Sequence, residues 1–163
     1  IREELAKLEV EVNEEKSRTV DMEKGEGFSF LGFDFRLVRN RSGGGAVLAT
    51  PQLKKRTALL ARLRGVFQSH RSVPVDLVIC KINPILRGWV NYFSHGNASR
   101  CFSYVRDWVE KKVRRHLARN HKRTGFGWKR WSKSRIYGTL GLFRAYRVER
   151  GPWQKALPVR CVT

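Results

Sequence analysis

The segment SRCFSYVRDWVEKKVRRHLAR, from Ser99 to Arg119, carries the clearest periodic pattern in this sequence. Its apolar residues recur at intervals of three and four, at Phe102, Val105, Val109, Val113 and Leu117. Because one turn of an α-helix takes about 3.6 residues, these side chains fall on one face of a helix. We therefore predict a helix that begins at Ser99 or Asn97, ends near Arg119, and buries this apolar stripe.

The opposite face of this helix combines aromatic rings with cations. Its members are Tyr104, Trp108, Lys111, Arg115 and Arg119. Lys and Arg side chains neutralise phosphates, and flat rings stack on unpaired bases or on ribose. We therefore expect the cations to bind a polyanion, whereas the two rings either join in that binding or pack against the C-terminal segment.

The basic and aromatic pattern continues in NHKRTGFGWKRWSKSR, from Asn120 to Arg135. Phe126, Trp128 and Trp131 are interleaved there with the cations Lys122, Arg123, Lys129, Arg130, Lys133 and Arg135. Glycines between these residues allow the backbone to approach a ligand closely. We predict irregular backbone with one or two short helices, and we expect these cations to bind nucleic acid.

Further helices are predicted from about residue 51. Thr50 suits the N-cap, and Pro51 the first position, of a helix over residues 51–69. The apolar face of this helix is expected to contain Leu53, Leu60, Leu63 and Phe67. Its other side adds the candidate RNA-binding residues Lys54, Lys55 and Arg62.

Two shorter helices are expected between this helix and Ser99. The first runs from Ser72 to near Ile82, and the second has Asn83 as its cap, begins at Pro84 and ends near Ser94. The second helix has two unlike sides, because Ile85, Trp89 and Phe93 recur at intervals of four, flanked by Leu86 and Val90. We predict that this side packs in the core, whereas Arg87 and Asn91 form a polar edge on which Arg87 is a further candidate RNA contact.

The first 50 residues follow a different period. GFSFLGFDFRLV, from Gly27 to Val38, alternates between aromatic and other residues, which predicts a strand with Gly32 as a bulge or a point of close backbone approach. AVLAT, from Ala46 to Thr50, reads as a returning strand, so residues 28–50 are expected to form a long-looped β-hairpin. Residues 1–8 resemble the end of a helix, and residues 12–20 a turn that enters a strand.

Charge divides the chain in the same place. The net charge is +20, yet residues 1–50 hold 8 basic and 10 acidic side chains while residues 51–163 hold 26 basic and only 4 acidic ones. So large a positive charge opposes compaction and is typical of a partner that is a polyanion. We expect that partner to bind the second region.

Several other classes of site are disfavoured. The three cysteines, Cys80, Cys101 and Cys161, are far apart, so we expect reduced and mostly buried thiols, and neither these nor the four histidines have metal-ligand spacing. There is no apolar run long enough for a membrane span. No phosphate loop, nucleophile motif or paired carboxylates stand out, so the chain alone is expected to be catalytically inactive and to bind no cofactor.

Two blocks of the sequence resemble one family. NEEKSRTV followed by FSFLGFDF is similar to the last palm motifs of group II intron-type reverse transcriptases, and INPILRGWVNYFSHGNASRCFSYVRDWVEKKVRRHLARNHKR resembles their maturase-specific region, which covers the thumb and domain X. The resemblance extends over roughly residues 12–147. The order N-P-x-x-R-G-W-x-N-Y-F in the second block is long and unusual, so that block is the more specific of the two.

The resemblance implies roles for particular residues. Lys16 matches a lysine near the phosphates of the incoming nucleotide, and Phe30, Leu31, Gly32 and Phe33 match the primer grip. Residues 51–119 match the thumb, and the segment after about residue 120 matches domain X, which contacts intron RNA. The catalytic carboxylates, which in the parent polymerase would hold Mg²⁺, together with the fingers and most of the palm, lie outside this sequence, so we expect a part of a longer protein.

We therefore predict an α+β fold in three parts: the end of a palm with a primer-grip-like hairpin (residues 1–50), a helical thumb (51–120) and a basic domain X segment (121–163). The expected partners are structured RNA, in particular a group II intron, an RNA–DNA primer–template duplex and the missing N-terminal reverse transcriptase domains. The expected location is cytoplasmic, and the expected role is support of intron splicing and mobility. Two alternatives stay open: part of a defence or retroelement reverse transcriptase, and a free-standing RNA-binding module.

Overall fold

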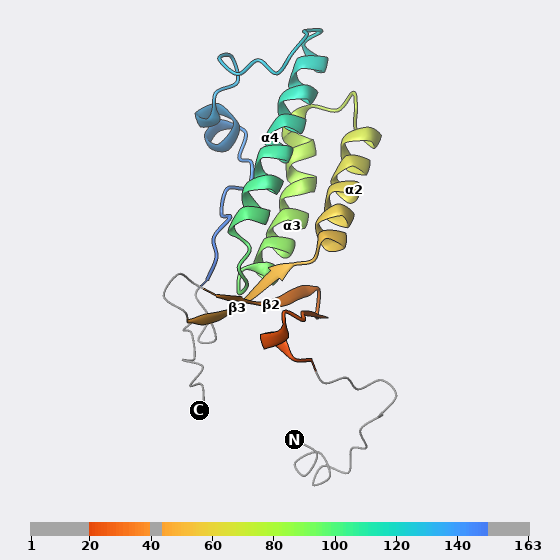
Figure 1. Ribbon diagram of the computed structural model, residues 1–163. Coiled ribbons are helices and arrows are strands. Elements are labelled where there is room, and N and C mark those ends of the chain that lie inside the picture. Colours follow the sequence, from red (N-terminus) through yellow and green to blue (C-terminus); the bar gives the residue numbers. More distant parts are fainter. Residues whose placement is uncertain (1–19, 40–43, 150–163) are drawn as a thin grey trace.

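The computed structural model describes residues 20–39 and 44–149. Within these ranges a three-stranded antiparallel sheet is followed by three helices, which confirms the predicted α+β class. The three helices run side by side as a bundle, and the sheet lies across one end of it (Figure 1). The predictions for residues 1–19, Lys16 among them, fall outside the described residues, as do those for Cys161.

The sheet has the order β1-β2-β3, with β1 at Phe28–Phe30, β2 at Phe33–Arg39 and β3 at Gly45–Pro51. A 3-10 turn, η2, precedes it at Met22–Lys24. The prediction of one strand with a bulge at Gly32 is wrong. Phe30 pairs with Phe33, and the two residues between them, Leu31 and Gly32, have φ values of 47° and 82°. Positive φ at both central residues makes a tight two-residue hairpin turn, so the aromatic alternation continues through a reversal of the chain.

Helix α2 spans Leu53–Ser69 and begins two residues later than predicted, because Pro51 is the last residue of β3. Its buried side chains are Leu59, Leu63 and Phe67. The predicted apolar face was therefore only half right: Leu53 is 63% exposed and Leu60 is half-buried. The prediction placed Leu53 and Leu60, seven residues apart, on the buried face. The residues that pack against the other helices are instead Leu59, Leu63 and Phe67, which recur at intervals of four.

Helix α3 spans Val75–Phe93 without a break, so the prediction of two helices divided at Asn83 and Pro84 is wrong. Asn83 is not a cap. Its Nδ2 donates to the Gly141 carbonyl at 2.9 Å, and its Oδ1 accepts from the Phe143 amide at 2.9 Å. Burial on a single face continues on both sides of Pro84, which keeps the chain helical despite the backbone hydrogen bond that a proline removes. The buried residues are Val75, Val78, Ile79, Ile82, Leu86, Val90 and Phe93.

Helix α4 spans Ser99–Asn120, and every residue of its predicted apolar stripe is buried. The prediction for the preceding segment is rotated by part of a turn: Phe93 is buried, but Ile85 and Trp89 are only half-buried, because Leu86 and Val90 point into the core instead. Trp89 packs on the ring of Phe93, with centroids 4.7 Å apart.

The turn between α3 and α4 fixes the sheet to the helices. The Asn97 amide donates to the Ala49 carbonyl at 2.6 Å, and the Asn97 side chain accepts from the Ala49 amide at 3.0 Å. A Cβ at Gly96 would lie 2.7 Å from the same carbonyl, so only glycine allows this approach. The Gly-Asn pair is thus a docking point for β3.

After α4 the chain is mostly irregular, as predicted, with one π-helical turn, η3, at Arg135–Thr139. Trp131, Ile136 and Leu142 from this segment are buried in the core that the helices form. The segment then returns to the sheet end, where the Glu149 amide donates to the Ser94 carbonyl at 2.9 Å.

The cysteines differ from the prediction of mostly buried thiols, because Cys80 is exposed and Cys101 is half-buried. Burial raises the pKa of the Cys101 thiol, and the charge of Arg56 opposes that rise. Among the described residues, no helix combines the length and apolar character that crossing a membrane requires. Across residues 20–39 and 44–149, no group of three His, Cys, Asp or Glu side chains is placed to hold a metal ion.

Candidate nucleic-acid interface

The basic face of α4 points away from the core, as the sequence predicts. Lys111, Arg115 and Arg119 are all exposed. Tyr104 is 49% exposed and Trp108 is half-buried. These side chains follow one another at intervals of three and four along the helix, so they form a continuous row.

Helix α2 lies beside this row and adds cations to it. The Arg56 guanidinium lies over the Tyr104 ring, 4.4 Å from its centroid. The Lys112 ammonium lies over the Trp108 ring at 5.1 Å, so Lys112 belongs to the surface that faces α2. Of the two alternatives for the rings, Trp108 packs partly against the core cluster that includes buried residues of the C-terminal segment, and both rings carry a cation. A cation over an aromatic face is attracted by the ring quadrupole.

A small cavity lies between the ends of α2 and α4 that are farthest from the sheet. We call it the distal cavity; its volume is about 200 Å³. It is lined by Arg64, Phe67, Gln68, Arg71, Lys112, Arg115, His116 and Arg119. Five of these side chains are Lys or Arg and none is a carboxylate, so the cavity is strongly electropositive. Burial, together with the charges of Arg64, Arg115 and Arg119, lowers the pKa of the Lys112 ammonium.

A larger cavity of about 800 Å³ lies next to the distal cavity and shares two of its lining residues. Arg71 and Arg119 line both, and Arg135 lines the second together with Asp76 at the start of α3. The structure therefore brings three of the predicted RNA-binding residues, Arg115, Arg119 and Arg135, onto one continuous surface.

The segment after α4 borders this surface on its other side. The Arg115 guanidinium lies 4.9 Å from the centroid of Phe126. The remaining predicted cations of this segment are all exposed: Lys122, Arg123, Lys129, Arg130 and Lys133. We use the name α2/α4 face for the whole surface formed by the row on α4, the cations of α2 beside it, and Phe126 and Trp128.

A buried ion pair fixes the segment to α4. The Glu110 carboxylate accepts from the Arg114 guanidinium at 2.8 Å and from the Tyr137 hydroxyl at 3.2 Å. Arg114 also donates to the Trp131 carbonyl, and its guanidinium lies 4.3 Å from the Trp128 ring centroid. Burial and the neighbouring Glu110 charge raise the pKa of Tyr137, which stays protonated and able to donate. Trp131, predicted only as part of the basic segment, is itself buried.

The remaining predicted cations lie elsewhere. Lys55 and Arg62 line a groove of about 570 Å³ between α2 and α3, with Trp89 and Tyr92. Lys54 lines a hollow beside the sheet. Arg87 is exposed on α3, as expected, but no contact joins it to the α2/α4 face within the described residues. The sequence analysis therefore grouped cations of the α2/α4 face with cations, such as Lys55 and Arg62, that line the groove between α2 and α3.

Four cations of the face were missed: Arg56, Arg64, Arg71 and Lys112. Their signal was available in part, because Arg56 and Arg64 are eight residues apart, near a whole number of helical turns, whereas Arg71 lies in the turn after α2. What the sequence did not supply was which side of α2 faces α4.

The hairpin at the sheet end has a different surface. Phe30 and Leu31 are 58% and 65% exposed, whereas Phe33 is buried against Phe93. The Tyr92 hydroxyl donates to the Leu31 carbonyl at 2.7 Å, which ties the turn to α3.

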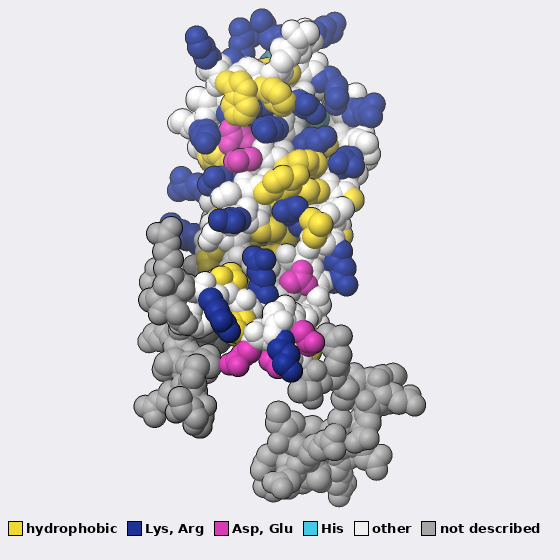
Figure 2. Space-filling view, in the orientation of Figure 1, with side chains coloured by type: hydrophobic (Ala, Val, Ile, Leu, Met, Phe, Trp, Pro, Cys, Tyr) yellow, Lys and Arg dark blue, Asp and Glu magenta, His cyan; other side chains and the backbone are white. Residues whose placement is uncertain are grey.

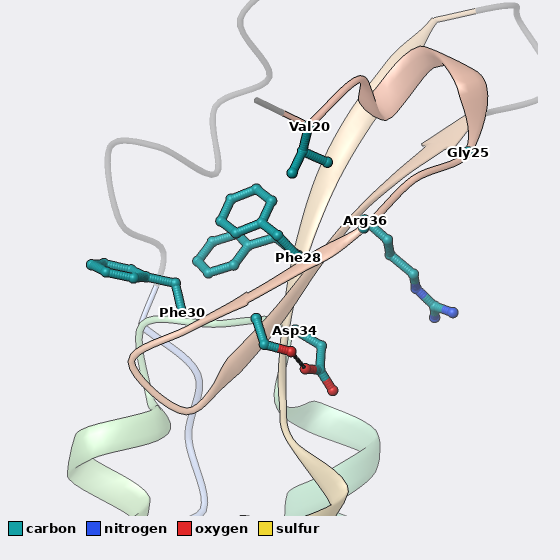
Figure 3. Close-up of a pocket in the computed structure, with 9 residues that line it drawn as sticks. Val20, Gly25, Phe28, Phe30, Asp34 and Arg36 are labelled. Atoms are coloured by element: carbon teal, nitrogen blue, oxygen red, sulfur yellow. Dashed lines mark hydrogen bonds between the residues drawn. The ribbon is translucent and has the colours of Figure 1, made fainter. Parts of the chain in front are cut away.

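A cavity of about 980 Å³ lies beside β1, where Val20 and the Phe28 ring face each other (Figure 3). Arg36 points away from the Phe28 ring, and the Ser29 hydroxyl donates to the Asp34 carboxylate at 2.6 Å (Figure 3). With one cation and one carboxylate, this cavity lacks the electropositive lining of the distal one.

The space-filling view agrees with this division. Lys and Arg side chains are spread over the helical part, with hydrophobic side chains between them, while acidic side chains are few there and more frequent near the sheet end (Figure 2). The part of the surface suited to a polyanion is therefore helical.

Comparison with known protein families gives a match. The family model of the group II intron maturase-specific domain matches residues 56–138. The matched residues contain nearly all of α2, the whole of α3 and α4, and the segment up to η3. A search of curated proteins found no match.

Proposed function

This chain belongs to the family of the group II intron maturase-specific domain, and on that premise we propose that it binds structured group II intron RNA through the α2/α4 face. The observation that carries the proposal is the distal part of this face, where five Lys and Arg side chains and no carboxylate line one cavity. The family match covers every residue of that cavity.

The chemistry of the face suits a folded RNA. Its cations neutralise phosphates, and the exposed parts of Tyr104, Trp108 and Trp128 offer ring surface to unpaired bases. The Tyr104 and Trp108 rings already carry the Arg56 guanidinium and the Lys112 ammonium group, which places positive charge beside each stacking surface. The two kinds of contact together favour RNA with exposed bases over a smooth duplex.

We also propose the wider role that the sequence resemblance implies. In that proposal the sheet is the end of a reverse transcriptase palm, the hairpin turn at Leu31 and Gly32 approaches a primer terminus, and the helices are a thumb beside an RNA–DNA duplex. The exposure of Phe30 and Leu31 supports a hairpin that contacts something outside the described residues. The parent protein would polymerise DNA with Mg²⁺ held by residues outside this sequence, while this chain alone would make none.

The test is RNA binding by the whole chain. We expect nanomolar-to-micromolar binding to a group II intron transcript, with an affinity that falls by roughly 10³–10⁵ between 50 and 200 mM salt if six to ten phosphates are contacted. A shuffled transcript of equal length and composition is the control. A nearly flat salt titration contradicts the proposal, and equal binding of both transcripts contradicts its specificity for the intron.

Sequencing of RNA recovered with the parent protein from cells separates the alternatives. An intron among the enriched RNAs is expected. Enrichment of a different structured RNA, with no intron, favours a defence or retroelement reverse transcriptase.

A further inference from the structure

The distal cavity concentrates more positive charge than a single backbone phosphate can balance. Its lining includes Arg64, Arg71, Lys112, Arg115 and Arg119 within about 200 Å³. A phosphodiester carries one negative charge, so a single phosphate would leave most of these five cations without compensation. The lining contains no acidic residue that reduces the excess.

The protein maintains this excess at a cost to its own stability. Like charges from two helices are held together, and the pKa of Lys112 is lowered by burial and by the guanidinium groups of Arg64, Arg115 and Arg119. An anion bound in the cavity would offset the repulsion from these guanidinium groups and raise the pKa of Lys112. Such an arrangement is typical of a site whose ligand supplies the missing negative charge.

A second observation concerns His116, which lines the same cavity and is 2% exposed. Its Nε2 lies 2.8 Å from the Val73 carbonyl oxygen and 3.2 Å from the Asn120 side-chain nitrogen. Nδ1 is buried and has no hydrogen-bond partner in the described part of the chain. Unpartnered buried polar atoms are rare, and a bound water commonly accounts for them; such a water can donate to the ring nitrogen and also to a phosphate oxygen.

We propose that the distal cavity binds several closely spaced phosphates, at a point where the RNA backbone folds back on itself. This proposal rests on the proposed function and narrows it: the cavity recognises a local fold of the RNA chain through its phosphate density, with no base readout. Arg71 and Arg119 also line the neighbouring cavity that reaches Arg135, so the backbone continues from one cavity into the other.

Inorganic tripolyphosphate is a suitable probe, because it concentrates negative charge in a small volume and contains no base or ribose. Its binding to the whole chain is measured by calorimetry, beside that of orthophosphate. The cavity variant is Arg64→Gln with Arg119→Gln, both exposed at the cavity mouth. The matched control is Lys81→Gln with Arg100→Gln, which removes the same charge from exposed sites that line neither cavity.

Tripolyphosphate is expected to bind the unmodified protein much more tightly than orthophosphate. Each charged contact removed should cost about tenfold, so the cavity variant should lose roughly a hundredfold while the control changes less than about threefold. Lys112 supplies an independent readout, since tripolyphosphate should slow its acylation by an amine-reactive reagent in the control variant and not in the cavity variant.

Equal losses in the two variants would mean that only total charge matters, and would overturn the proposal. So would an absence of tripolyphosphate binding in a protein that still binds intron RNA, an outcome that leaves the proposed function intact. Failure of the unmodified protein to bind any structured RNA would instead overturn the proposed function itself, and with it the RNA assignment of the cavity.

Discussion

The charged Arg114 side chain is buried, with 1% of it exposed. It forms a salt bridge with Glu110, which lies one helical turn away and is 4% exposed. A buried ion pair contributes little over an apolar pair of the same volume, yet breaking it leaves one charge uncompensated. The pair therefore fixes the position of the C-terminal segment, through Tyr137 and the Trp131 carbonyl, more than it adds stability.

Replacement of Arg114 alone should be severe. Arg114→Met leaves the Glu110 carboxylate buried, with the Tyr137 hydroxyl as its one remaining partner among the described residues, so we expect a loss of about 3–5 kcal/mol in the free energy of unfolding. Urea denaturation followed by circular dichroism measures it. The double variant Arg114→Met with Glu110→Leu should recover most of the loss, and a double variant as unstable as the single one would contradict this account.

Trp89 tests the packing of α3 on α4. Its ring contacts Phe93 at 4.7 Å and Phe102 at 5.8 Å between centroids, but it is only half-buried, and its indole Nε1 has no partner in the described structure. Trp89→Ala should cost about 3 kcal/mol, the lower end of the usual range for a large aromatic truncation.

The companion variant Trp89→Phe keeps most of the ring and removes the unpartnered donor. We expect less than half the loss of Trp89→Ala in the same denaturation experiment, because burying a donor without a partner is itself unfavourable. If RNA binding collapses in Trp89→Ala while stability does not change, Trp89 is a contact residue and not a core residue.

At the scale of the elements, α4 divides cleanly into a buried stripe and an exposed basic row. The row adds nothing to the core, so its charges are open to change without loss of the fold. Lys111→Glu with Arg115→Glu and Arg119→Glu should alter stability by less than about 0.5 kcal/mol per site. RNA affinity should fall by far more, and the slope of log K against log salt should shrink by about 2 to 3 for three lost contacts.

The control for this triple variant changes three exposed cations away from the α2/α4 face to Glu: Arg36, Lys81 and Arg100. Electrophoretic mobility shift over a salt series compares the two. Similar losses of affinity would show that the α4 row has no special role.

Helices whose ends and buried face depend on local sequence pattern were predicted correctly, and those that depend on long-range packing were not. The α4 stripe was predictable because each of its five residues meets the core on one face. The division of α3 at Asn83 and Pro84 was wrong because a local cap signal competed with burial that continues across it, and burial prevailed. The Glu110–Arg114 pair was missed because only the returning C-terminal segment covers it, and its position depends on long-range packing.

At the scale of the whole molecule, the acidic and basic side chains are distributed differently between the sheet and the helices. Most of the acidic side chains in view lie near the sheet end, with a few among the helices, and most of the cations lie over the helices (Figure 2). The sequence predicted that asymmetry and the α+β class, but it assigned cations from two faces to one interface. Separating the α2/α4 face from the groove between α2 and α3 requires the packing angle of α2, which no periodicity in the sequence contains.

A net charge of +20 has a measurable effect on the RNA-free protein. Self-repulsion destabilises the folded state, and salt screens it. We expect the melting temperature to rise by about 2–4 °C for each kcal/mol of repulsion screened as NaCl increases from about 50 to 500 mM. Differential scanning fluorimetry measures the rise, which should be smaller in the α4 triple variant. A melting temperature that falls over this range would contradict the expectation.

The return of the chain to the sheet has a mechanical consequence. Val20 lies beside β1, and the Glu149 amide donates to the Ser94 carbonyl, so the first and last described residues lie at the sheet end of the bundle. Tension applied through those two points would load the sheet end and peel its contacts apart one after another. The opposite tip of α2 and α4, where the distal cavity lies, would carry almost none of that load. An RNA held there would stay bound while the sheet end yields.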